Sequence, residues 1–128
     1  MDFPDAEFDA VVGVSVFTHL PNQLQDIWLA ELRRVTKPGG VLILSVHSED
    51  FAKSRLSSSQ FADLEANGIH YLVHATGIAK LDGLPDYYQV TFHTQAHIES
   101  QWSKHFEIVD YVKHGIGAIQ DAVILRRV

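Results

Sequence analysis

The sequence contains no cysteine among its 128 residues. This absence excludes a disulfide framework, a thiolate metal site and any chemistry that uses an enzyme thiolate. A chain without cysteine also suits a reducing compartment, so we expect a cytoplasmic protein.

Basic residues are scarce as well. Lys and Arg together number 10 against 16 for Asp and Glu, which gives a formal net charge of -6. Basic residues cluster only as the pairs Arg33-Arg34 and Arg126-Arg127. Because binding to a phosphate backbone depends on gathered positive charge, we expect no nucleic-acid partner.

Long apolar runs are also missing. No segment approaches the roughly 20 apolar residues of a membrane span, and the start, MDFPD, lacks the basic and apolar regions of a signal peptide. We therefore expect no membrane partner. With 46% hydrophobic and 20% charged residues, the composition is that of a folded globular chain, and its length suits one domain over residues 1–128.

Residues 8–47 carry the clearest pattern of the chain. Residues 9–17 are almost all apolar and do not alternate, which predicts a strand covered on both faces. Helical spacing follows, then a turn at residues 37–40 (KPGG) and a second apolar strand at residues 41–46. A single helix between two such strands predicts a right-handed crossover, with the strands parallel and adjacent. The helical positions are Leu24, Ile27, Trp28, Leu32 and Val35.

The rest of the chain predicts shorter elements. Ser57 and Gln60 have the spacing of a capping box for a helix over residues 60–67, with Gly68 as its stop. Residues 70–75 and 87–93 are possible strands, and Thr94 begins a helix that ends near residue 105. Residues 106–112 and 122–128 are strand-like and close enough to form an antiparallel hairpin.

The segments FDAVVGVSVFTHLP and WLAELRRVTKPGGVLILSVH resemble the second half of the core of class I S-adenosylmethionine-dependent methyltransferases. In that family residues 10–17 look like the fourth strand and residues 41–47 like the fifth. The final hairpin is similar to the sixth and seventh strands, of which one is antiparallel. The implied fold is α/β, a partial Rossmann-like sheet of parallel strands closed by a C-terminal antiparallel hairpin, with helices packed on it.

The resemblance implies S-adenosylmethionine as cofactor and places the site at the carboxyl ends of the strands. Backbone at Val14, Ser15 and Val16 would then flank the cofactor, while Thr18, His19 and His47 would face a small-molecule methyl acceptor. His19 is the candidate general base, since imidazole transfers protons near neutral pH. The alternative is that His19 only caps or braces the start of the helix, and His47 has the same structural alternative.

No Gly-x-Gly-x-x-Gly element and no acidic ribose partner precede Phe8. We therefore expect a single truncated methyltransferase-like domain that binds S-adenosylmethionine weakly or not at all on its own. Two interpretations stay open. The chain is either part of a methyltransferase or a non-catalytic, self-associating interaction module. An unpaired edge from Val11 to Phe17 would favour a homodimer.

Two histidine pairs have a spacing of four residues, which on a helix would bring two imidazoles together. These are His70 with His74 and His93 with His97. Both pairs fall in segments that we interpret as strands or strand ends, where this spacing separates the rings, so we expect no metal site.

Overall fold

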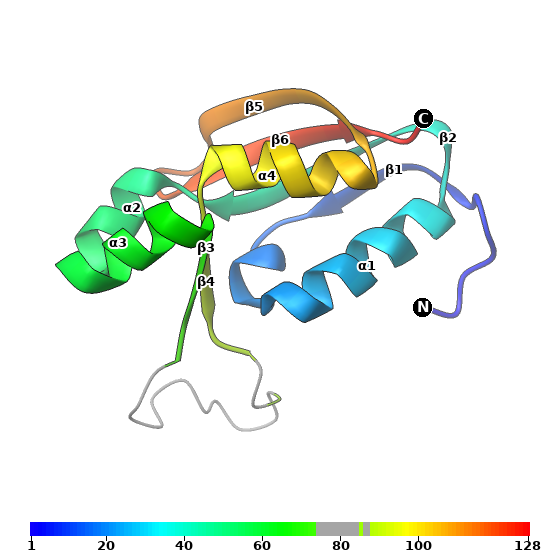
Figure 1. The fold of residues 1–128 in the computed structure, drawn as a ribbon. Helices are drawn as coiled ribbons and strands as arrows, with labels where there is room; N and C mark the ends of the chain where they lie inside the picture. The colour runs from blue at the N-terminus through cyan, green and yellow to red at the C-terminus, as the bar shows by residue number, and fades with distance from the viewer. Residues whose placement is uncertain (74–84, 86–87) are drawn as a thin grey trace.

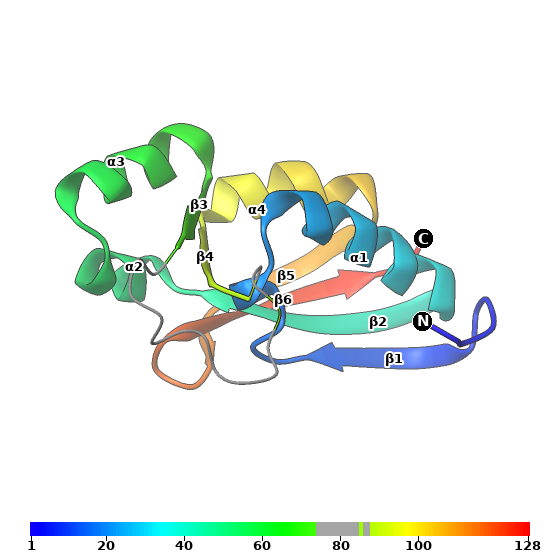
Figure 2. The ribbon, with the colours of Figure 1, turned by 90° about the horizontal axis from the view of Figure 1, so that it is seen from below.

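The computed structural model describes residues 1–73, 85 and 88–128. Within these residues six strands form one mixed sheet, in the order β3-β4-β2-β6-β5, with β1 also paired to β2 (Figure 1). The helices α1 and α4 lie over the same side of this sheet (Figure 2). The α/β class expected from the sequence is confirmed.

The strands β1 (Phe8–Gly13) and β2 (Thr36–His47) are parallel neighbours, and the crossover between them is α1 (Asn22–Val35). The pairing runs from Ala10 beside Val41 to Gly13 beside Leu44. In α1 the buried residues Leu29, Leu32 and Val35 recur at helical spacing and face the core. The predicted strand-helix-strand unit is therefore confirmed.

The first strand is shorter and less covered than the sequence predicts. It ends at Gly13, and a 3-10 turn, η1 (Phe17–His19), follows a short loop. Ser15 has a φ of 58°, a left-handed conformation that cannot continue a strand. Val12 is 65% exposed, so the prediction of a strand buried on both faces was wrong. Among the described helices, α1 and α4 lie over one side of the sheet (Figure 2).

The turn predicted at residues 37–40 lies inside the bounds of β2. Gly39 takes a φ of 80°, which turns the chain before the apolar run begins. A Cβ on Gly40 would stand 2.8 Å from the Lys37 carbonyl oxygen and 3.0 Å from the Asp9 carbonyl oxygen. This close approach of backbones explains why the second position must also be glycine.

The C-terminal strands β5 (Glu107–Ile116) and β6 (Gln120–Arg126) form the predicted antiparallel hairpin. Strand β6 lies between β5 and β2 and is antiparallel to both. The sheet therefore closes with one antiparallel strand, as the family resemblance implies.

Four shorter helices or turns and two strands complete the described fold. The capping box of Ser57 and Gln60 is present, and Gly68 ends its helix with a φ of 77°. Thr94 caps α4 through a 3.2 Å hydrogen bond from the His97 N–H. The sequence did not predict α2. The bounds are α2 (Glu49–Arg55), α3 (Ser58–Asn67), α4 (Gln95–Gln101), η3 (Trp102–Lys104), β3 (Ile69–Leu72) and β4 (Val90–His93).

Two apolar clusters hold these elements together. The larger one joins α1, α4 and η3 to β2 and β6, and its largest rings, Phe17 and Trp102, have centroids 5.0 Å apart. The smaller one joins α2 and α3 to β4 around Leu64 and Phe92. Strand β4 pairs with β2 only where Phe92 lies beside His47. The smaller cluster is thus attached at the carboxyl end of β2, where the candidate site lies.

No helix among the described residues has both the length and the apolar character needed to cross a membrane. The cytoplasmic location and the single-domain organisation remain predictions.

Candidate functional site

The carboxyl ends of β1 and β2 bring two of the predicted histidines to one pocket. His19 ends the η1 turn that follows β1, and His47 is the last residue of β2. Both line a cavity of about 490 Å³ that we call the histidine pocket. Its described lining residues are His19, His47, Phe51, Arg55, Leu72, Val90 and Phe92.

The His19 ring is held in one tautomer. Its Nδ1 lies 2.6 Å from the carbonyl oxygen of Gln89, and a carbonyl oxygen can only accept, so Nδ1 carries the proton. The neutral ring therefore has an unprotonated Nε2. The ring also stacks on Tyr88, with centroids 4.2 Å apart and planes 15° apart. This bracing fixes the orientation of His19. Tyr88 and Gln89 could not be predicted from the sequence, because they lie about 70 residues from His19 along the chain.

The His47 ring is neutral at physiological pH. The side chain is buried between Phe51 and Phe92, with ring centroids 4.8 and 5.3 Å away. Burial, together with smaller contributions from the nearby His19 and Arg55, lowers the pKa of His47 to about 4. Its Nδ1 is buried and has no hydrogen-bond partner among the described residues. His47 is therefore a polar group on an apolar wall whose hydrogen-bonding capacity is not fully used.

Thr18, the third residue predicted on the acceptor side, is fully buried. It is not among the described residues that line the histidine pocket, and its Oγ1 has no hydrogen-bond partner within the described part of the chain. The structure thus brings His19 and His47 together but not Thr18.

A buried polar network fastens the η1 turn to β4. The Leu20 carbonyl oxygen accepts hydrogen bonds from Gln25 Nε2 at 2.8 Å and from Thr91 Oγ1 at 2.7 Å. Gln25 Oε1 in turn lies 2.8 Å from His93 Nε2, which must donate because the amide oxygen can only accept. Burial lowers the pKa of His93 to about 3. The network fixes the backbone that follows His19.

Val14, Ser15 and Val16 lie in the loop after β1, at the predicted cofactor side. Val14 and Val16 are 48% and 44% exposed, so their surroundings are open. The Ser15 N–H already donates to Ser45 Oγ at 2.8 Å, and Ser15 Oγ accepts from Gln120 Nε2 at 2.8 Å. These backbone and side-chain groups are satisfied internally. The described residues alone therefore do not fit S-adenosylmethionine, because neither a glycine loop nor an acidic ribose partner adjoins them.

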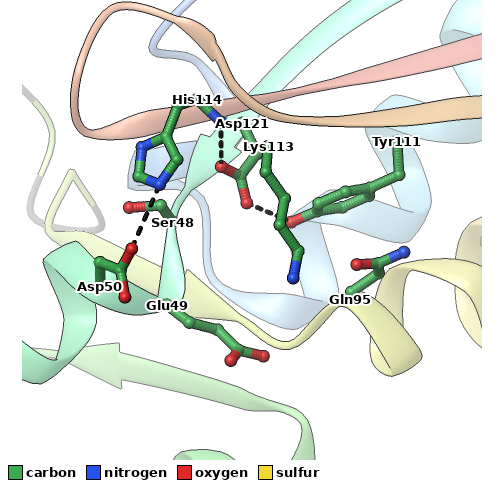
Figure 3. Close-up of a pocket in the computed structure, with 8 residues that line it drawn as sticks. All are labelled: Ser48, Glu49, Asp50, Gln95, Tyr111, Lys113, His114 and Asp121. Carbon is green, nitrogen blue, oxygen red and sulfur yellow. Dashed lines mark hydrogen bonds and ion pairs between the residues drawn. The ribbon is translucent and has the colours of Figure 1, made fainter.

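A second, smaller pocket of about 70 Å³ lies at the β5–β6 turn (Figure 3). Asp121 is buried and accepts from the Tyr111 hydroxyl at 2.7 Å and from the His114 N–H at 2.8 Å. His114 also contacts Asp50 Oδ2 at 3.2 Å and the Ala118 carbonyl at 2.9 Å. We call Asp50, Tyr111, His114 and Asp121 the polar cluster. The polar groups of these four residues hydrogen-bond to one another.

The histidine pairs do not form a metal centre in the described part of the chain, where no group of three His, Asp or Glu side chains is placed to hold an ion. His70 Nδ1 lies 2.7 Å from Asp63 Oδ2, and His74 falls outside the described residues. His93 belongs to the network with Gln25, and its ring centroid lies 6.0 Å from that of His97.

The sheet order and the pocket at the carboxyl ends of two parallel strands are those of an open α/β sheet. Residues 1–44 match the family model described as a methyltransferase domain. Over these residues the resemblance to methyltransferases expected from the sequence is supported, and S-adenosylmethionine is the cofactor that this resemblance implies.

A curated relative covers only a short stretch. The 2-methyl-6-phytyl-1,4-hydroquinone methyltransferase of Synechocystis is 40% identical over 45 residues, which is 35% of this chain and 14% of that protein.

Solved structures match over nearly the whole chain. A SAM-dependent methyltransferase from Methanosarcina mazei has a TM-score of 0.60 at 18% identity, covering 100% of this chain and 63% of its own. The 1,6-didemethyltoxoflavin-N1-methyltransferase of Burkholderia thailandensis was solved with bound 1,6-didemethyltoxoflavin and S-adenosylhomocysteine. It has a TM-score of 0.61 at 13% identity, and the match covers 96% of this chain and 45% of that protein. At these identities the likeness shows the fold, and the chain spans less than two thirds of each protein.

Proposed function

We propose that this chain forms the acceptor-binding part of an S-adenosylmethionine-dependent methyltransferase that acts on a small molecule. The observation that supports this most is that His19 and His47, at the carboxyl ends of adjacent parallel strands, line one largely apolar pocket. Two methyltransferases that this chain resembles are named for small molecules, 2-methyl-6-phytyl-1,4-hydroquinone and 1,6-didemethyltoxoflavin.

In this proposal His19 is the general base. Its Nδ1–H is engaged by the Gln89 carbonyl, so Nε2 is the nitrogen able to take a proton from the acceptor. Stacking on Tyr88 and the bonds to the Leu20 carbonyl hold the ring and its backbone still. Pre-fixed orientation of this kind favours proton transfer because little reorganisation is needed at the moment of reaction.

The cofactor supplies the methyl group in this family, and residues beyond Val14, Ser15 and Val16 must hold it. We propose that another segment, of the same polypeptide or of a partner, provides the glycine loop and the ribose contact. Titration of the purified chain with labelled S-adenosylmethionine tests this. We expect affinity weaker than micromolar, and saturable micromolar binding to the isolated chain would contradict the division of the site.

The catalytic part is tested with His19→Gln, which keeps the size of the side chain but removes its basicity. In a preparation in which the unchanged chain transfers labelled methyl, we expect kcat to fall by about 10²–10⁴ with a small change in acceptor KM. His114→Gln is the matched control, since His114 lies in the polar cluster. Equal losses in the two variants would refute a role for His19 as base.

A non-catalytic, self-associating module is the second candidate function. It is favoured by β1, which among the described strands pairs only with β2 and carries Val12 at 65% exposure. Such an edge presents unpaired backbone groups to a second copy, and a two-fold homodimer through β1 is the simplest closed form.

Light scattering of the unchanged chain and of Val12→Lys tests the proposed self-association. We expect the unchanged chain to be dimeric at micromolar concentration and the variant to be monomeric, because a lysine on the edge opposes strand pairing. Ile119→Lys is the control, since Ile119 is also exposed, at 44%, but lies at the β5–β6 turn. A stable monomer of the unchanged chain would rule the dimer out.

A further inference from the structure

The walls of the histidine pocket are mainly apolar. Phe51 and Phe92 present aromatic rings whose centroids are 6.0 Å apart, and Leu72 and Val90 add aliphatic surface. A cavity of about 490 Å³ is large enough for a ring-sized molecule. Such walls favour a ligand that buries an aromatic or aliphatic body.

Arg55 provides positive charge at this pocket. Its guanidinium carbon lies 5.1 Å from the centroid of the Phe51 ring, a cation–π contact that holds the charge beside the apolar wall. Arg55 is exposed and forms no ion pair with a carboxylate among the described residues, and none of the described lining residues is acidic. A guanidinium without a partner at a pocket matches the geometry of a carboxylate in a ligand.

The positive charge of Arg55 contrasts with the net negative charge of the chain. The whole chain carries a formal charge of -6, so its average field repels anions. His47 adds no charge near pH 7, because burial holds its pKa at about 4. The attraction for an anion in this pocket therefore centres on Arg55.

We infer that the histidine pocket binds an aromatic carboxylate, with the ring against Phe51 and Phe92 and the carboxylate accepting hydrogen bonds from Arg55. The identification of this ligand as the methyl acceptor rests on the proposed function, whereas its binding does not. A neutral ring compound would lack the charge-assisted hydrogen bonds to Arg55, and an aromatic ammonium ion would be repelled by it.

The test is a calorimetric titration of the chain with three ligands of the same size, without S-adenosylmethionine: benzoate, benzamide and benzylamine. Charge-assisted hydrogen bonds predict that benzoate binds at least about tenfold more tightly than benzamide, with benzylamine weakest. Arg55→Gln should abolish the preference for benzoate over benzamide. Lys53→Gln, on the same helix, is the control, because Lys53 Nζ lies over Phe61, 5.8 Å from its centroid.

Three results overturn the inference. They are no saturable binding of benzoate up to about 10 mM, equal binding of benzoate and benzamide, or equal loss in Arg55→Gln and Lys53→Gln. The outcome is separable from that of the proposed function. A preference for benzoate without methyl transfer would support the carboxylate-binding site and refute the proposed methyltransferase function. Methyl transfer to neutral acceptors only would support the proposed function and refute the carboxylate-binding site.

Discussion

Two pockets adjoin the carboxyl end of β2, one around His47 and the other around Ser48, the next residue along the chain. In the polar cluster each buried polar atom meets a partner, and Asp121 accepts two hydrogen bonds. In the histidine pocket Arg55 has no carboxylate partner among the described residues, and His47 Nδ1 has no hydrogen-bond partner there either.

The difference separates structural polar groups from binding groups. A buried polar group that is fully satisfied stabilises one conformation and has little left to offer a ligand. A buried group whose capacity is unused, such as His47 Nδ1, costs free energy until something pairs with it. Substitutions in the polar cluster should therefore change stability, and substitutions in the histidine pocket should change binding.

The largest effect on stability is expected from Asp121→Ala. The change leaves the half-buried Tyr111 hydroxyl and the His114 N–H without their acceptor, which should lower the free energy of unfolding by about 1–3 kcal/mol. Urea denaturation measures it. Asp110→Ala is the control, because Asp110 is exposed and accepts only the Tyr111 N–H. Similar losses in both variants would erase the contrast between the two pockets.

His47, the neutral histidine of the histidine pocket, should make the protein less stable in acid. The folded-state pKa of His47 is lowered to about 4, so the unfolded chain takes up a proton first as pH falls. This contribution is present above about pH 6.5 and is lost between about 6.5 and 4. After allowance for partial solvent exposure, we expect His47 to account for about 2 kcal/mol of that loss.

Urea denaturation at pH 7 and pH 4 of the unchanged chain and of His47→Gln provides the measurement. The loss of stability in acid should be smaller in the variant, because glutamine does not titrate. His105→Gln is the control, since His105 lies outside both pockets. An unchanged acid loss in His47→Gln would mean that His47 is not held neutral by burial.

The smallest effect is expected at His114, and its sign is opposite. Hydrogen bonds to the Ala118 carbonyl and to Asp50 raise the pKa of His114, so its stabilising contribution is complete below the unfolded value and is lost as pH rises through the folded one. His114→Asn tolerates the left-handed φ of 54° at this position. The difference in urea midpoint between the unchanged chain and His114→Asn should shrink from acid to alkaline pH. A difference that grows would contradict a raised pKa of His114 in the folded state.

The sequence predicts best where local chemistry decides the structure. Non-alternating apolar runs on either side of one helix indicate the parallel pair, and the spacing of Ser57 and Gln60 indicates a capping box. Both are present. The helix α2 was missed because seven residues are too few for an apolar stripe to appear.

Features that depend on distant partners could not be predicted. Strand β1 ends early because Ser15 is held in a left-handed conformation by Ser45 and Gln120, which are 30 and 105 residues away. Arg34 binds Asp5 and the carbonyl oxygens of Met1 and Phe3, which are about 30 residues away. Nothing local in the sequence marks these contacts.

The candidate site divides in the same way. His19 and His47 were predicted because each follows a strand, and strand ends converge in a parallel sheet. Phe51, Arg55 and Phe92 were not, because α2 and β4 reach the site only through the attachment of β4 to the end of β2. The chemical character of the pocket is thus a tertiary property.

An NMR titration that follows the ring signals of the histidines while benzoate is added tests most directly whether the histidine pocket is the binding site. We expect saturable shifts for His19 and His47, with the same midpoint, and none for His114. Shifts of His114 with His19 and His47 unmoved would place binding at the polar cluster and contradict the central claim.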